Sequence, residues 1–165
     1  MRLFVAVCCS SAVRNSLAKV IAALRHQGSG TFTRPENLHL TLAFIGETDR
    51  VDEAKAAVRR AAVGGSFSLA VEGIGCFGDL WWAGVRKDTR LEQLALGVQQ
   101  SLREADFPIE ERSWWPHITL VRRWRGPRPQ VDIPPVSMQV EAVSLMKSEQ
   151  VEGKTVYMEI ARISL

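Results

Sequence analysis

Two short segments of the chain each place a histidine and a threonine two residues apart in an apolar stretch. The first is Leu-His-Leu-Thr-Leu at residues 38 to 42, and the second is Pro-His-Ile-Thr-Leu at residues 116 to 120. Histidine is the natural proton carrier near neutral pH, because its unperturbed pKa is about 6.5. Threonine hydroxyls donate hydrogen bonds to anionic oxygens. The two segments together hold the groups that acid–base chemistry at a phosphodiester requires.

The alternation of a β-strand determines which of these side chains lie together. Successive side chains point to opposite faces, so His39 and Thr41 share one face while the leucines around them share the other. The same holds for His117 and Thr119. If two such strands face each other, the imidazoles flank the attacking and leaving oxygens, and the hydroxyls hold the non-bridging oxygens.

The recurrence of the motif argues against a purely structural role for its histidines. A single His-x-Thr on a strand is usually a half-buried structural histidine. Here the motif returns after an interval of 78 residues, about half the chain, which indicates an internal duplication. Only His26 stands outside the pair. It ends a predicted helix, where a histidine cation complements the helix dipole, so we expect it to be structural or merely exposed.

Two histidines in one protein have two rival uses. A metal site would need further Cys, Asp or Glu ligands at suitable spacing, and none lies next to either motif, so no metal and no cofactor is predicted. The second rival is an RNA-binding or adaptor module that keeps the cleft without turnover. Two complete motifs favour the enzyme, because a binder needs no proton donor opposite a proton acceptor.

The elements that must position the motifs follow from hydrophobic periodicity. Apolar residues at helical spacing predict helices over residues 11 to 25, 51 to 62 and 89 to 105, with Asp49 as the cap of the second. Strands are predicted over residues 3 to 7, 38 to 45, 67 to 76, 80 to 85, 116 to 120, 138 to 146 and 155 to 163. Neighbouring strands without an intervening helix predict an α+β fold with largely antiparallel sheets.

Composition indicates an ordinary globular protein. Of the 165 residues, 46% are hydrophobic and 24% charged, and this length is sufficient for one self-standing unit, so residues 1–165 are predicted to form a single domain. The three cysteines are odd in number and show no paired C-x-x-C spacing, which fits a reducing cytoplasm. No apolar run approaches the roughly 18 residues of a membrane span, so no membrane association is expected.

Charge is unevenly distributed along the chain. The net charge is only +3, yet the stretch between Glu111 and Asp132 carries five arginines and no acid. Such a local positive field attracts phosphate backbones, although a solvated surface would have the same composition. The position of the stretch around the second motif favours nucleic acid as the partner.

Three further side chains near the motifs are candidates for substrate contact. Arg122 and Phe44 each follow their histidine by five residues, an odd offset that points them away from the histidine face unless a bulge intervenes. Trp115, with its neighbour Trp114, could stack on the bases beside the phosphate. Core packing is expected for at least one of the two tryptophans.

Three segments carry a resemblance to a known family. They are Arg-Leu-Phe-Val-Ala-Val at residues 2 to 7, Arg-Pro-Glu-Asn-Leu-His-Leu-Thr-Leu-Ala-Phe-Ile-Gly-Glu at 34 to 47, and Pro-His-Ile-Thr-Leu-Val-Arg at 116 to 122. The chain resembles the 2H phosphoesterase superfamily, and within it the RNA 2′,3′-cyclic phosphodiesterases of the LigT-like, 2′-5′ RNA ligase family. The resemblance covers nearly the whole chain. It is loose over residues 145 to 157 and assigns no role to Lys154 or Tyr157.

The resemblance implies two pseudo-symmetric lobes around a cleft, each an antiparallel sheet with packed helices. It also implies hydrolysis of a terminal 2′,3′-cyclic phosphate to a 2′-phosphomonoester, without metal. By position, His39 corresponds to the proton donor and His117 to the proton acceptor, while Thr41 and Thr119 correspond to phosphate binders. The reverse reaction, joining RNA ends through a 2′,5′ linkage, is associated with the same family.

The sequence leaves the physiological substrate open. RNA with 2′,3′-cyclic phosphate ends, such as tRNA fragments, is the expected partner, and a small cyclic nucleotide is the alternative. No protein partner is indicated, and the chain is expected to act as a monomer in the cytoplasm.

Overall fold

The computed structural model describes all 165 residues and contains nine strands, three α-helices and one 3₁₀ helix. The strands are β1 (Arg2–Cys8), β2 (Ser29–Phe32), β3 (His39–Glu47), β4 (Phe67–Phe77), β5 (Leu80–Val85), β6 (His117–Arg125), β7 (Val136–Val140), β8 (Ala142–Val151) and β9 (Lys154–Ser164). The helices are α1 (Ser11–Arg25), η1 (Pro35–Asn37), α2 (Val51–Ala61) and α3 (Thr89–Glu104). None of the helices is both long and apolar enough to cross a membrane.

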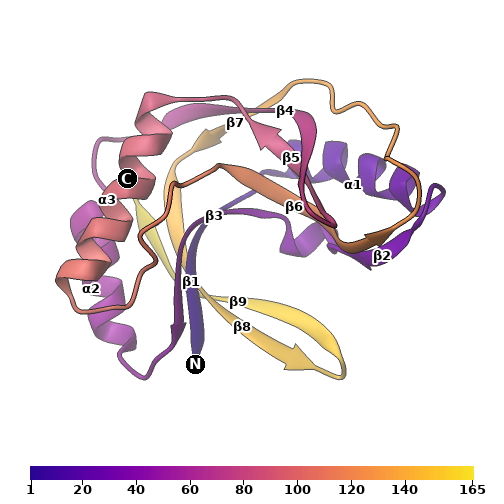
Figure 1. Ribbon diagram of the computed structural model, residues 1–165. Coiled ribbons are helices and arrows are strands. Elements are labelled where there is room, and N and C mark those ends of the chain that lie inside the picture. Colours follow the sequence, from indigo (N-terminus) through magenta and orange to yellow (C-terminus); the bar gives the residue numbers. More distant parts are fainter.

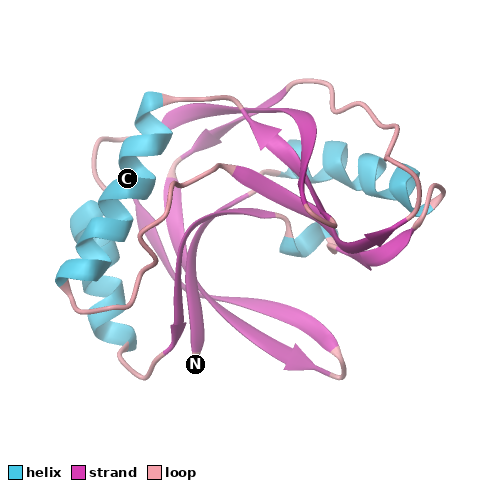
Figure 2. Cartoon of the chain, in the orientation of Figure 1, coloured by secondary structure: helices cyan, strands magenta, loops and turns pink.

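The strands form two sheets, and every pairing is antiparallel (Figure 2). One sheet has the strand order β3-β1-β8-β9, and the other has the order β2-β6-β5-β4-β7. The α+β class predicted from the sequence is confirmed. The two motif strands, β3 and β6, belong to different sheets, yet their Cα atoms come within 8 Å of each other.

The helices cover the two sheets separately. At one end of the molecule, α2 and α3 lie side by side, with α3 against β3, and α1 lies at the other end beside β7 and β2 (Figure 1). The Ser10 hydroxyl accepts a hydrogen bond from the Val13 amide at the start of α1, and Asp88 does the same for Leu91 in α3. The expected cap of α2 is wrong: the N-cap is Arg50, and no side chain caps this helix.

Two further sequence predictions need correction. The strand predicted over residues 138 to 146 is two strands, β7 and β8, which belong to different sheets and are separated by Glu141. Apolar residues alternate or cluster on both sides of Glu141, so hydropathy alone merges the two strands. The short edge strand β2 was missed because its sequence is polar and contains Gly30. A Cβ at Gly30 would lie 2.8 Å from the Arg122 carbonyl oxygen, so the close approach of β2 to β6 requires glycine there.

The motif strands are anchored by the main hydrophobic core. The leucines at positions 38, 40 and 42 and the residues Ile118 and Leu120 are each at most 2% exposed. These five residues belong to one cluster of 39 buried residues that is continuous across both sheets. A second, small cluster of Phe4, Ala6 and Met146 lies apart from it, with Cys8 and Tyr157 packed against it. The rigid core fixes the position of each motif backbone.

Candidate active site

Strands β3 and β6 present their motifs in the same way. Each has nine residues and begins at its histidine, and the first six positions of each have the same order of half-buried, buried and exposed side chains. His39, Thr41, His117 and Thr119 are all half-buried, while the residues between them are buried. The predicted alternation is therefore present in both strands.

His39 is held on both sides of its ring. Its Nδ1 lies 2.6 Å from the Asn37 carbonyl oxygen, and its Nε2 lies 2.9 Å from the Thr41 hydroxyl. Because a carbonyl oxygen only accepts, Nδ1 carries the proton, and Nε2 is left to exchange a proton with a substrate. The rings of Phe4 and Tyr157 enclose the imidazole, with centroids at 5.0 and 5.2 Å.

His117 has a matching but more open arrangement. Its Nδ1 donates to the Trp115 carbonyl oxygen at 2.7 Å, so this imidazole also presents Nε2. The ring of Phe77 lies edge-on at 5.1 Å, and that of Trp82 is tilted at 6.2 Å. Unlike Nε2 of His39, Nε2 of His117 has no hydrogen-bond partner in the protein. The two histidines are therefore equivalent by sequence but unequal in their surroundings.

The electrostatic environment favours the neutral form of both imidazoles. Burial lowers the pKa of His39, the bond to the Asn37 carbonyl opposes this, and the positive charges of Arg122 and His117 lower it further. Burial likewise lowers the pKa of His117, with opposition from the Trp115 carbonyl and reinforcement from Arg122 and Arg112. Arg122 is common to both, so its charge lies near both histidines.

A β-bulge explains how Arg122 comes to the histidine face. Along β6, Thr119 pairs with Trp82 and Val121 pairs with Trp81, so Leu120 is an extra residue without a partner. Leu120 and Val121 are both buried in succession, and Arg122 is exposed. The bulge reverses the parity of the strand beyond it. On a regular strand, Arg122 would lie on the face opposite His117, because it follows His117 by five residues. With Leu120 as an extra residue, Arg122 lies on the same face as His117.

The equivalent bulge is present in β3. Thr41 pairs with Ala6 and Ala43 pairs with Val5, which leaves Leu42 unpaired at the position that corresponds to Leu120. Phe44 beyond it lies on the same face as His39, and its ring is 6.4 Å from that of Phe4. With 59% of its surface exposed, Phe44 is open to a ligand.

The two tryptophans before β6 have different roles. Trp114 packs against the main core, and its Nε1 donates to the Thr41 carbonyl oxygen at 3.1 Å, which links the two motifs directly. One tryptophan therefore has the packing role that was expected. Trp115 is 60% exposed, and its backbone orients His117.

Four aromatic side chains around the histidines were missed by sequence reasoning: Phe4, Tyr157, Phe77 and Trp82. They lie on strands other than β3 and β6, so no motif spacing identifies them. Trp82 alone is accompanied by a feature of the sequence, the glycine at position 75. The Trp82 ring lies over Gly75, where a Cβ would come within 2.3 Å of it. Together the rings flank both imidazoles.

Of the other four arginines of the basic stretch, Arg112 lies before β6 and pairs with Glu110, and three extend along β6 and the loop after it. Arg123, Arg125 and Arg128 are all exposed, and none forms an ion pair. Arg123 has a positive φ of 55°, at a second irregularity of the pairing between β2 and β6. Arg123 donates a hydrogen bond of 3.5 Å to the Thr31 hydroxyl, and the Arg128 guanidinium lies 6.0 Å from the centre of the Trp81 ring, so no carboxylate neutralises these charges.

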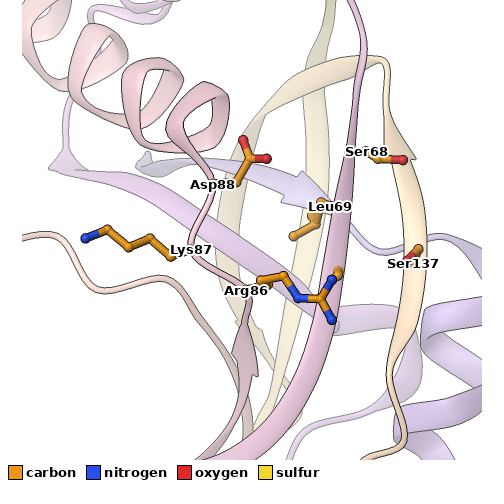
Figure 3. Close-up of a pocket in the computed structure, with 7 residues that line it drawn as sticks. Ser68, Leu69, Arg86, Lys87, Asp88 and Ser137 are labelled. Atoms are coloured by element: carbon orange, nitrogen blue, oxygen red, sulfur yellow. The ribbon is translucent and has the colours of Figure 1, made fainter.

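A shallow hollow of about 230 Å³ lies elsewhere, between β4, β7 and the start of α3 (Figure 3). Its lining includes Ser68, Arg86 and Ser137 and neither histidine. The Arg86 guanidinium makes two hydrogen bonds, of 2.9 and 3.1 Å, with the Glu72 carboxylate, which neutralises the main cation there. This hollow therefore lacks the paired imidazoles and hydroxyls of the histidine site. Nowhere in the structure do three or more His, Cys, Asp or Glu side chains lie together in a way that could hold a metal ion.

Two antiparallel sheets that each present a histidine–threonine strand to the other define a phosphoesterase of the two-histidine class. The chain belongs to the 2′-5′ RNA ligase superfamily, whose family model matches residues 13–152. It is 32% identical over 163 residues to the RNA 2′,3′-cyclic phosphodiesterase of Thermotoga maritima, covering 90% of this chain and 87% of that protein. A Geobacillus stearothermophilus phosphodiesterase of the same name is 36% identical over 109 residues, which are 60% of this chain and 34% of that protein.

Solved structures show the same fold. The crystal structure of Escherichia coli LigT in its apo form has a TM-score of 0.86 and 26% identity, with 99% of this chain and 96% of LigT covered. The complex of LigT with 3′-AMP has a TM-score of 0.81 and 28% identity over the same shares of the two chains.

Proposed function

We propose that the chain hydrolyses terminal 2′,3′-cyclic phosphates of RNA, such as those on tRNA fragments, to 2′-phosphomonoesters. The observation that carries this proposal is the meeting of two histidine–threonine strands from different sheets with one arginine charge near both imidazoles. The names of the relatives and the nucleotide complex of LigT support it.

The reaction follows from the presented Nε2 atoms. His117 removes a proton from a water molecule as its oxygen attacks phosphorus, and the bond from phosphorus to the 3′ oxygen breaks. His39, protonated on Nε2, gives its proton to that oxygen. The product carries a 2′-phosphate and a free 3′ hydroxyl, and solvent then resets the two imidazoles. A 5′ hydroxyl in place of water would join RNA ends through a 2′,5′ linkage.

The charge that develops on the phosphate needs donors other than the histidines. Thr41 and Thr119 lie beside the two imidazoles, and the Arg122 guanidinium adds a positive charge near both. In this assignment the hydroxyls and Arg122 hold the non-bridging oxygens. These groups and the two imidazoles supply every step, so the proposed mechanism uses no metal.

Replacing Thr41 or Thr119 by valine is expected to weaken transition-state stabilisation by about 1–3 kcal/mol each, as for a lost bond to a charged group. Valine keeps the shape and the branch, so the fold should survive. The measurement is kcat/KM on a cyclic-phosphate substrate. Serine at the same positions restores the hydroxyl and serves as the matched control, and equal activity of valine and serine variants would remove the threonines from the mechanism.

Neutralising Arg123, Arg125 and Arg128 together is expected to weaken RNA binding and to flatten its dependence on salt. Each lost contact with a single strand should reduce the slope of log K against log salt by about 0.7. Turnover of a cyclic mononucleotide should change little. Removal of the exposed charges of Arg59 and Arg60 on α2 is the control. If both sets of variants bind RNA with the wild-type slope, the basic stretch is only a solvated surface.

The pH dependence of hydrolysis is expected to be bell-shaped, with both limbs at lower pH than free imidazole would produce. His39 acts as acid below its pKa and His117 as base above its pKa, and burial and Arg122 lower both pKa values. The limbs belong to the coupled pair. A profile of kcat/KM against pH tests this, and Arg122→Gln should move both limbs to higher pH. Limbs above the range of free imidazole would contradict it.

Single strands of RNA would lie over exposed aromatic rings and the basic stretch. Phe44 beside the first motif and Trp115 beside the second are both more than half exposed, which supports stacking of bases on them. Both motifs come from one chain, which supports a monomer as the active form. The three cysteines, Cys8, Cys9 and Cys76, are all free, which supports a reducing, cytoplasmic location.

The decisive experiment incubates the protein, with a chelator present, with a short RNA that ends in a 2′,3′-cyclic phosphate. A product with a 2′-phosphate and a 3′ hydroxyl is expected. A parallel reaction with a cyclic mononucleotide distinguishes an RNA enzyme from one for small cyclic nucleotides. RNA binding without turnover would identify an adaptor, and turnover only in the absence of chelator would identify metal-dependent chemistry.

A further inference from the structure

Asn37 makes two contacts that connect distant parts of the chain. It is the last residue of η1, two positions before His39, and its carbonyl oxygen accepts the His39 Nδ1 proton at 2.6 Å. Its side chain turns the other way, where Nδ2 donates to the carbonyl oxygen of Thr155 in β9 at 3.0 Å. One residue therefore contacts both the catalytic imidazole and the β8–β9 hairpin.

The outer part of this hairpin has little other support. β1 pairs with β8 only from Ser144 to Ser148, so residues 149–156 pair with each other alone. The hairpin projects from the body of the molecule in Figure 1. A two-stranded hairpin is marginally stable by itself. Asn37 is the one residue outside the β8–β9 hairpin that forms a hydrogen bond with residues 149–156, while Glu149 pairs with Lys147 within the hairpin.

The hairpin carries a ring that covers His39. Tyr157 lies two residues after Thr155, and its ring stands at 90° to the imidazole with the centroids 5.2 Å apart. Phe4 lies 5.0 Å from both rings and closes the other side. Tyr157 pairs with Ser148, the last residue of β8 that pairs with β1, so its ring lies where the unsupported part of the hairpin begins. The ring covers one side of the imidazole.

We propose that Asn37 is a positioning residue, which orients His39 through its carbonyl and, by anchoring the hairpin through its side chain, holds the Tyr157 ring over the imidazole. This inference rests on the proposed function, because it gives His39, the proposed acid, a positioning residue and a covering ring that His117 lacks. The charged and titratable groups that face His39 are Arg122 and His117 from β6 and Tyr157 from β9, with Cys8 as its neighbour on β1. Only Tyr157 is carried by the hairpin.

The test replaces Asn37 by alanine, which removes the amide and keeps the backbone carbonyl. The expected result is that the His39 imidazole, followed by NMR in the absence of substrate, titrates at higher pH than in the wild type, because water reaches the ring. We expect kcat to fall about 10-fold with little change in KM, as for a displaced catalytic group. Gln150→Ala is the matched control, since it removes an amide that bonds Thr155 only within the hairpin.

A second pair of variants separates the cover from the anchor. Tyr157→Leu removes the ring edge and should reproduce the shift of the His39 titration, whereas Tyr157→Phe should keep the wild-type titration. The double variant Asn37→Ala/Tyr157→Leu should shift it no further than either change alone. The proposal is overturned if Asn37→Ala leaves the titration unchanged in a folded protein, or if Gln150→Ala shifts it equally. Absence of turnover in the wild type would reject the proposed function, while the titration would still decide this inference.

Discussion

Alanine in place of His39 or His117 is expected to lower the rate of cyclic-phosphate hydrolysis by a factor of about 10² to 10⁴, the usual contribution of a general acid or base. Each imidazole is fixed through Nδ1 by a backbone carbonyl, which leaves its Nε2 to exchange a proton, and alanine removes that group. The measurement is the single-turnover rate on a short RNA with a cyclic end. Binding of the RNA should change far less.

The third histidine provides the control for this loss. His26 is the C-cap of α1 and exposed, so His26→Ala should keep wild-type turnover. Near wild-type turnover in either the His39 or the His117 variant would show that the two-histidine mechanism is wrong.

A substrate whose leaving oxygen needs no protonation is expected to restore activity to His39→Ala and not to His117→Ala. An aryl ester of a nucleotide is such a substrate, because the aryloxide departs without a proton. The acid then has nothing to contribute, whereas water must still be activated by the base. The expected recovery is most of the factor lost on the natural substrate, again about 10² or more.

The opposite outcome is equally informative. Recovery of the His117 variant alone would reverse the assignment of acid and base. The more open surroundings of His117, with no partner for Nε2, are consistent with a base that must reach a water molecule. The isomer of the natural product provides an independent check, since a 3′-phosphate would mean that the substrate lies in the cleft in the opposite direction.

Much of this site could be predicted from the sequence, because local periodicity determines it. Alternation along a strand places His39 with Thr41 and His117 with Thr119 whatever the partner strands are. The three helices were predicted within about a turn for the same reason, since their apolar spacing is set by the helix period. The repeat of the motif after 78 residues indicated two facing units before any pairing was known.

Features that depend on pairing between distant strands could not be predicted. The bulges at Leu42 and Leu120 exist only relative to β1 and β5, and they alone turn Phe44 and Arg122 toward the histidines. The division of one apolar run into β7 and β8 likewise depends on which sheet each half joins.

The sequence by itself determined the two reacting side chains, their hydroxyl neighbours and the α+β class, because each follows from residue type and a period of two or 3.6 residues. Only the tertiary structure decided the surroundings that make the two histidines unequal. Tyr157 reaches His39 from a strand 118 residues away, and Phe77 reaches His117 from another strand. The physical reason is that burial and hydrogen bonding set a pKa, and both arise from contacts that the order of strands in the two sheets brings together.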